Sequence, residues 1–173
     1  TESASPSLNR PMSDAFTSIG LLILRLGMGG YMLTHGIGKL QMLLEGKFDQ
    51  FSDPIGWGST MSLIMIVVAE FGCAILVMVG FATRLAAVTL VIAMGVAAFK
   101  VHGGDPWTMG AAAKLFSAGE AESWASKEPA LLFLFPFLAL VFTGAGKASV
   151  DALIGGRMRR AGQDDGGRGR IQS

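Results

Sequence analysis

Apolar residues gather along the chain in four long runs separated by polar segments: residues 19–40, 61–81, 85–101 and 130–146. A helix rises about 1.5 Å per residue, so about twenty residues cross a hydrocarbon core about 30 Å thick. We therefore expect an all-α integral membrane protein, folded as a bundle of four transmembrane helices.

Polar segments flank these runs at both ends. We assign residues 1–18 to a polar N-terminal leader without the features of a removable signal peptide, residues 19–154 to the membrane domain, and residues 155–173 to a flexible basic tail rich in Gly and Arg. The mean hydropathy of +0.50 and the 16% of charged residues are typical of a membrane protein. The net charge of +1 gives no indication of a nucleic-acid partner.

The connections between the runs predict the topology. With four spans, the termini and the short turn at residues 82–84 share one side, which carries eight Lys or Arg residues against five on the other side. This excess favours both termini in the cytoplasm.

Gly80 is a natural helix stop. In the long segment between the last two runs, apolar spacings at residues 107–116 predict a short helix on the bilayer surface.

Two charged residues, Arg25 and Glu70, lie inside the first and second runs. A charge in a bilayer costs several kcal/mol and usually has a partner within the protein. Counted from the cytoplasmic ends, Arg25 is about 9 Å deep and Glu70 about 16 Å deep, a gap that an arginine side chain can span. We therefore expect an ion pair, either as a structural contact that fixes the helix register or as part of a proton or quinone site.

Several short motifs together resemble the DoxX family over residues 21–151. They are Arg25, His35-Gly36, Lys39, Glu70 ahead of residues 80–84, His102, residues 144–146, Ser149 and Asp151. The resemblance implies a four-helix protein of the bacterial inner membrane, in a family that includes relatives of the membrane subunits of thiosulfate:quinone oxidoreductase. We expect Ser149 and Asp151 to cap or tether the cytoplasmic end of the fourth span.

The polar residues nearest the outer leaflet predict a small-molecule site. A quinone headgroup needs hydrogen-bond donors at its carbonyl oxygens and an apolar slot for its ring, which Tyr31, His35, Lys39 and His102 could provide together with Glu70. A histidine at a helix end is also common as a hydrogen-bonded interface residue. Two histidines at one depth permit bis-histidine ligation of haem, whereas a zinc site lacks further ligands, so we expect no metal site.

These observations lead to two hypotheses on function. The first is a small membrane subunit or anchor of a quinone-linked redox system, without a redox centre of its own, so that it is at most a subunit of an oxidoreductase and depends on a bound quinone or a partner protein. The second is a non-catalytic accessory subunit that packs against a larger membrane complex. A homo-oligomer is compatible with either hypothesis.

Overall fold

The structure is a computed structural model that describes residues 10–158, and these residues form helices joined by loops, with no strand among them. The helices are α1 (Arg10–Leu44), η1 (Phe48–Gln50), α2 (Ser59–Val67), η2 (Val68–Cys73), α3 (Ala74–Val79), α4 (Thr83–Val96), η3 (Ala97–Val101), α5 (Met109–Ser117), α6 (Glu128–Thr143) and a final helix at residues 150–158. Two of these segments, η2 and η3, are π-helical turns that continue α2 and α4 without a break.

Within the described residues 10–158, three helical stretches are long and apolar enough to cross a membrane: Asp14–Leu44, Ser59–Val79 and Thr83–Val101. The fourth apolar helix, α6, has 16 residues and is shorter; at about 1.5 Å per residue it measures about 24 Å. The prediction of an all-α helical membrane bundle is confirmed.

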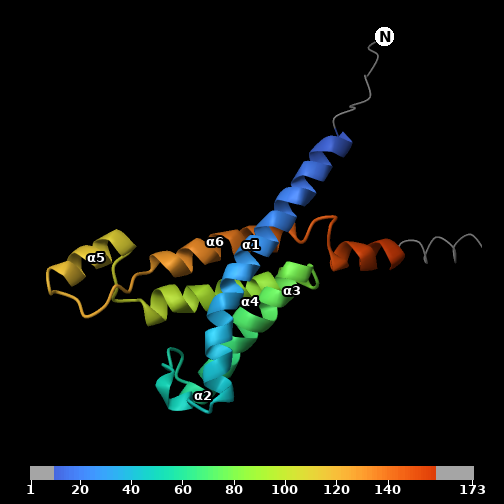
Figure 1. Ribbon diagram of the computed structural model, residues 1–173. Coiled ribbons are helices and arrows are strands. Elements are labelled where there is room, and N and C mark those ends of the chain that lie inside the picture. The colour runs from blue at the N-terminus through green and yellow to red at the C-terminus, as the bar shows by residue number, and fades with distance from the viewer. Residues whose placement is uncertain (1–9, 159–173) are drawn as a thin grey trace, which may run out of the picture.

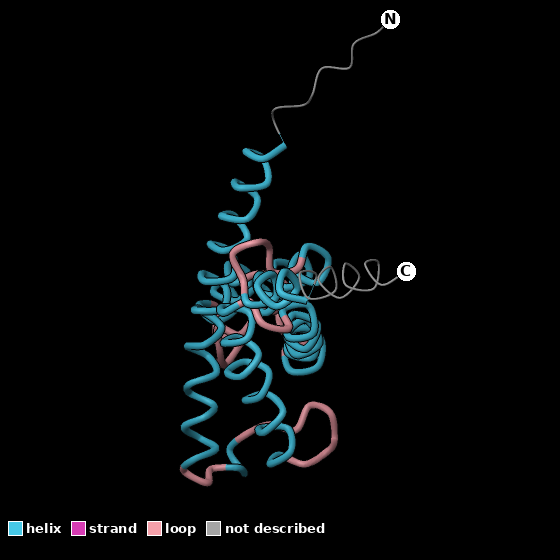
Figure 2. Tube along the Cα trace, turned by 90° about the vertical axis from the view of Figure 1, so that its right-hand side faces the viewer, coloured by secondary structure: helices cyan, strands magenta, loops and turns pink. Residues whose placement is uncertain are grey.

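The helices pack as two pairs. Figure 1 shows α1 running beside α2–α3, and α6 running beside α4, while α3 and α4 meet at a tight turn and the two pairs diverge from it. Figure 2, turned by 90°, shows α4 and α6 end-on while α1 and α2–α3 descend side by side. Buried Met32, Ala74, Val77, Leu90 and Phe137 lie where the pairs cross and form the core.

The tight turn confirms the predicted helix stop. Gly80 adopts a left-handed conformation with φ of +72°, and its N–H bonds to the carbonyl of Leu76 at 2.9 Å. Glycine adopts such a conformation without the steric cost that a Cβ brings. The next helix, α4, therefore begins three residues later and runs back antiparallel to α3.

The ends of the helices differ in places from the predicted boundaries. Described residues 10–18, assigned above to the polar leader, are the first turns of α1, and Asp14 within them accepts a hydrogen bond from the Lys147 side chain at 2.8 Å. The remaining leader residues 1–9 and tail residues 159–173 lie outside the described residues, whereas residues 155–158 belong to the final helix. A helix is present in the segment predicted at residues 107–116, as α5.

Candidate functional site

A cavity of about 430 Å³ lies between the diverging helices, bordered by α2–η2 on one side and by α4–η3 on the other. Its walls are mostly apolar, with Ile66, Ala93 and Ala97 among the lining residues. Three residues with ionisable side chains also line it: Lys39 from α1, Glu70 from η2 and His102 from the end of η3. The cavity therefore combines an apolar slot with a small number of polar groups, which is the usual character of a small-molecule site.

Glu70 is held at the cavity wall by Lys39. The side chain of Glu70 is only 4% exposed, and Nζ of Lys39 contacts both carboxylate oxygens. The wider π-helical turn at η2 presents Glu70 toward α1, and such turns are frequent at functional sites. Opposite charges that neutralise each other explain how the carboxylate is kept in an apolar bundle.

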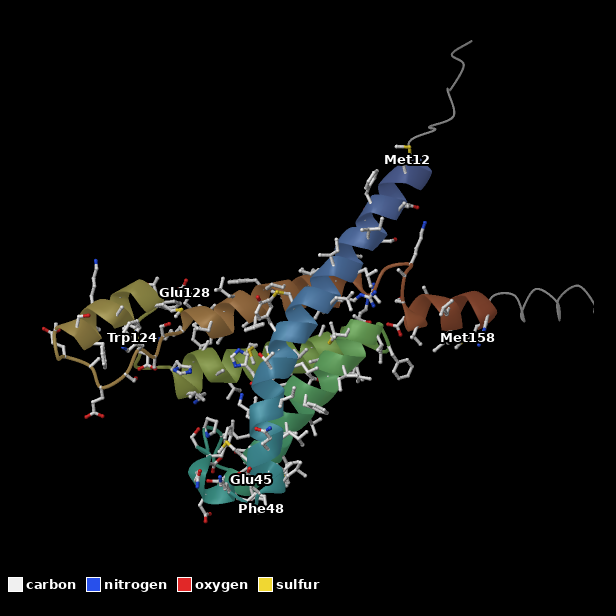
Figure 3. All side chains as sticks on the ribbon, in the orientation of Figure 1. Met12, Glu45, Phe48, Trp124, Glu128 and Met158 are labelled. Carbon is white, nitrogen blue, oxygen red and sulfur yellow. The ribbon has the colours of Figure 1, made fainter. Side chains whose placement is uncertain are left out.

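His102 is fixed by the loop that follows it. Its Nδ1 lies 2.8 Å from Oδ2 of Asp105. The backbone carbonyl of Asp105 accepts a hydrogen bond from the Lys127 side chain, whose Nζ also lies 5.3 Å from the centre of the Trp107 ring. These contacts join the loop to the start of α6. Figure 3 shows Glu128 at this start, and its carboxylate accepts a hydrogen bond from the backbone N–H of Met109 at 2.6 Å.

A second loop closes the cavity near the start of α2. Phe51, Pro54 and Ile55 are lining residues, and Asp53 between them organises the loop. One Asp53 carboxylate oxygen accepts hydrogen bonds from the N–H groups of Gly56 and Trp57 and from the Ser62 hydroxyl, and the other accepts from the N–H of Gly58 at 2.7 Å. The bonds from Ser62 and from these backbone groups hold the pKa of Asp53 below its ordinary value of 3.8.

The expected ion pair between Arg25 and Glu70 is not formed. Arg25 is fully buried, and its Nη2 donates a hydrogen bond to the carbonyl of Ala148 at 2.5 Å, while Glu70 is paired with Lys39. The cause is the register of the antiparallel helices. Gly36 lies against Glu70, and Arg25, eleven residues earlier on α1, lies beside Gly80. Eleven residues span about 16 Å along a helix, which is too far for contact.

The segment after α6 holds the turn between α3 and α4. Both carboxylate oxygens of Asp151 accept hydrogen bonds, from the N–H groups of Ala82 at 2.8 Å and Thr83 at 3.0 Å. Burial raises the pKa of Asp151, but these N–H groups, together with the charge of Arg25, lower it by more. The hydroxyl of Ser149 accepts from the N–H of Ala152 at 3.2 Å. The two residues therefore cap α4 and the final helix, whereas we had expected them at the end of the fourth span.

Two of the expected quinone ligands lie elsewhere. Tyr31 is 70% exposed on the outer face of α1. His35 is also exposed, and its ring packs edge-on against Phe133 with 5.6 Å between ring centres. Neither residue lines the cavity. Because His102 lines it and His35 does not, the structure does not bring the two histidines together as a haem site would require.

Sequence reasoning missed two residues that shape the site. Asp105 follows His102 by three residues, a spacing at which a loop can return a carboxylate to the ring. Asp53 stands shortly before Gly56, Gly58 and the helix start at Ser59, and an Asp in such a segment commonly accepts hydrogen bonds from the backbone N–H groups of a turn. Both signals were present in the sequence, although each occurs often in proteins without any site.

Comparison with known proteins finds a family match for part of the chain. Residues 20–103 match the family model described as DoxX. The match runs from α1 to just past His102, so it includes Lys39, Glu70 and His102 but neither α6 nor the segment that contacts Arg25. No curated protein and no solved structure matches the chain significantly.

Proposed function

We propose that this protein, a DoxX-family membrane protein by the match of residues 20–103, binds a quinone in the cavity lined by Lys39, Glu70 and His102. The observation that carries the proposal is the cavity itself, an apolar slot of about 430 Å³ with a small set of ionisable groups at its wall. An aromatic ring fits apolar walls, and its two oxygens need the few polar partners that such a wall supplies.

The outer rim of the cavity suits a ligand that arrives through the bilayer. Three lining residues are partly exposed on the outside of the bundle: Met65 at 43%, Ile92 at 62% and Val101 at 46%. In a membrane these side chains face lipid, so the rim between α2 and α4 is an apolar passage. A ligand with an isoprenoid tail can keep the tail in this passage while the headgroup occupies the cavity.

The same geometry supports a role as a subunit or anchor of a redox system. We propose that electrons reach the bound quinone from a partner membrane or peripheral protein that carries the redox centre, and that the chain itself supplies the quinone site. A homo-oligomer is compatible with this arrangement.

We also propose the bacterial inner membrane as the location, with both termini in the cytoplasm. The support is the excess of Lys and Arg on the side of the termini and the Gly80 turn. Single cysteines at Gln50 and Arg157, in a Cys73→Ala background, test it with a thiol reagent that does not cross membranes. Labelling of Gln50→Cys but not Arg157→Cys in whole spheroplasts is expected, and the reverse pattern would contradict the orientation.

Quinone binding is tested with two matched substitutions. Ala97 lines the cavity, whereas Ala139 is exposed on α6. We expect Ala97→Phe to fill the cavity and abolish binding of duroquinone to the protein in lipid nanodiscs, while Ala139→Phe binds it like the unmodified protein. Unmodified protein that binds neither duroquinone nor its reduced form, or Ala97→Phe protein that binds duroquinone normally, would overturn the proposal.

An accessory structural role is the second candidate, favoured by the first turns of α1. Met12, Phe16, Ile19 and Ile23 are each more than half exposed there, and Figure 3 shows Met12 near the free end of the helix. A stripe of this kind can pack against another membrane helix. This role predicts that substitutions on the stripe, and none in the cavity, affect assembly with a larger complex.

A further inference from the structure

Resting on the proposed quinone site, we propose that the cavity recognises the reduced, hydroquinone form of its ligand in preference to the oxidised form, and that His102 accepts a hydrogen bond, and then a proton, from one hydroxyl of that ligand. The argument depends on which groups at the wall donate hydrogen bonds and which accept them.

Asp105 determines the hydrogen-bonding character of His102. A carboxylate can only accept hydrogen bonds, so the contact of 2.8 Å requires Nδ1 of His102 to carry a hydrogen. In the neutral ring the other nitrogen, Nε2, is then an acceptor. Within residues 10–158 Nε2 has no hydrogen-bond partner, and His102 lines the cavity. The ring therefore offers an acceptor to a ligand.

The loop keeps this arrangement in place. The Lys127 side chain, itself buried, donates to the backbone carbonyl of Asp105, and the N–H of Lys127 bonds to the carbonyl of Pro106 at 3.0 Å. The Lys127 ammonium contacts the backbone carbonyl of Asp105 and the Trp107 ring. The Asp105 carboxylate therefore remains available to bind His102. A carboxylate that orients an imidazole in this way fixes its tautomer.

Lys39 supplies the complementary group at the same cavity. Its ammonium has three hydrogens, and contacts to the two oxygens of Glu70 use two of them. One hydrogen remains for a ligand. Glu70 is neutralised by this pair, so among the three ionisable residues of the wall Lys39 offers the donor and His102 the acceptor.

A hydroquinone satisfies both groups, whereas a quinone satisfies one. Each hydroquinone oxygen both donates and accepts, so one hydroxyl can donate to Nε2 of His102 while the other oxygen accepts from Lys39. A quinone has only acceptor oxygens, and one of them would face the lone pair of Nε2. With a quinone bound, Nε2 of His102 lacks a donor, and this unfavourable contact falls on the oxidised form alone.

The hydrogen bond also defines the proton-transfer step. The O–H bond of the ligand breaks and an N–H bond forms at Nε2, which leaves the hydroquinone monoanion beside Lys39 and an imidazolium ring hydrogen-bonded to Asp105. The Asp105 carboxylate and the Lys39 ammonium stabilise the two new charges. No electron moves in this step.

The test compares binding of duroquinol and duroquinone, the former kept reduced under anaerobic conditions, to the protein in lipid nanodiscs. We expect duroquinol to bind about tenfold more tightly, which for a two-electron couple corresponds to a rise of about 30 mV in the potential of the bound quinone. In Asp105→Asn the amide can donate to Nδ1, so that Nε2 carries the hydrogen, and we expect the preference to disappear or reverse. Glu122→Asn, an exposed acid remote from His102 in the sequence, is the matched control and should keep it.

The outcomes separate this inference from the proposed site. If duroquinol and duroquinone bind equally, or if the preference survives both Asp105→Asn and His102→Phe, the inference is wrong although the quinone site stands. If neither compound binds to the unmodified protein, the quinone site is wrong and the inference fails with it. Preference for the reduced form that is lost in Asp105→Asn and retained in Glu122→Asn supports the inference.

Discussion

Gly36 lies directly against the backbone of Glu70. A Cβ atom on Gly36 would come within 2.7 Å of the carbonyl carbon and oxygen of Glu70 and of the nitrogen of Phe71. All three atoms belong to the backbone, so none of them can move aside as the end of a flexible side chain could. The absence of a side chain at Gly36 is what lets the π-helical turn of η2 approach α1 closely enough for Glu70 to reach Lys39.

We predict that Gly36→Ala separates η2 from α1. Overpacking of this kind costs about 1–3 kcal/mol, measured as the free energy of unfolding in mixed SDS micelles, and it should also weaken duroquinone binding. Gly38 on the same helix has open space around its Cα. Gly38→Ala should therefore be neutral or stabilise the helix by about 0.5–1 kcal/mol. Equal effects of the two substitutions would contradict the close contact at Gly36.

A second prediction concerns the partner of Glu70. Because the Glu70 side chain is 4% exposed and Lys39 27% exposed, we expect Lys39→Met alone to cost about 3 kcal/mol by leaving a buried carboxylate unpaired. In the double variant Lys39→Met with Glu70→Leu, much of this loss should be recovered. Arg25→Met with Glu70→Leu should be additive within about 0.5 kcal/mol, since these residues are not in contact. A coupling energy between Arg25 and Glu70 in this cycle would instead support the ion pair between them that the sequence predicted.

The pairing of Glu70 with Lys39 also illustrates which features of the structure can be predicted from the sequence and which cannot. Helix positions follow from local apolar periodicity, and the predicted runs at 61–81 and 85–101 lie within two residues of the observed helices at both ends. The partner of Glu70 depends instead on how two antiparallel helices slide and rotate against each other. Depth counted along each helix does not define that register, whereas the close approach at Gly36 does.

The partner of Arg25 could not have been inferred from the sequence. The guanidinium binds a backbone carbonyl, that of Ala148, in a segment more than 120 residues later. Every residue has a carbonyl, so no residue type marks this one. The position of His35 was misjudged for a related reason: it shares a stripe with Lys39 along α1, but the two helix pairs diverge, and only part of that stripe faces the cavity.

We predict that Gly80→Ala is strongly destabilising for two separable reasons. The left-handed backbone, with φ of +72°, costs about 1–2 kcal/mol for a residue with a Cβ. In addition, the Cβ would overlap Nη1 of Arg25 at 1.9 Å and approach the Cβ of Ser149 at 2.6 Å. Gly119 has a similar φ of +75° in open space, so Gly119→Ala measures the backbone cost alone. A loss of stability no larger at Gly80 than at Gly119 would show that Arg25 does not pack there.

The last prediction uses the pKa of Asp53. Its pKa in the folded protein lies below the ordinary value of 3.8 because Ser62 and the backbone N–H groups favour the ionised form. The ionised carboxylate therefore stabilises the folded protein at pH above that ordinary value, and the stabilisation is lost as the pH falls through the lowered pKa. We expect Asp53→Ala to be less stable than the unmodified protein at neutral pH, and the difference to shrink below pH 3.8.

The loop that Asp53 organises carries Phe51, Pro54 and Ile55 against the cavity, so its loosening should be visible at the site as well. Hydrogen exchange at the N–H groups of Gly56 and Gly58 should become faster in Asp53→Ala, and duroquinone should bind more weakly. Asp49, in the same connection, makes no hydrogen bond through its carboxylate in the described part of the chain, and Asp49→Ala should leave both measurements unchanged. Faster exchange with unaltered binding would mean that the loop is fastened by Asp53 but contributes nothing to the ligand's affinity.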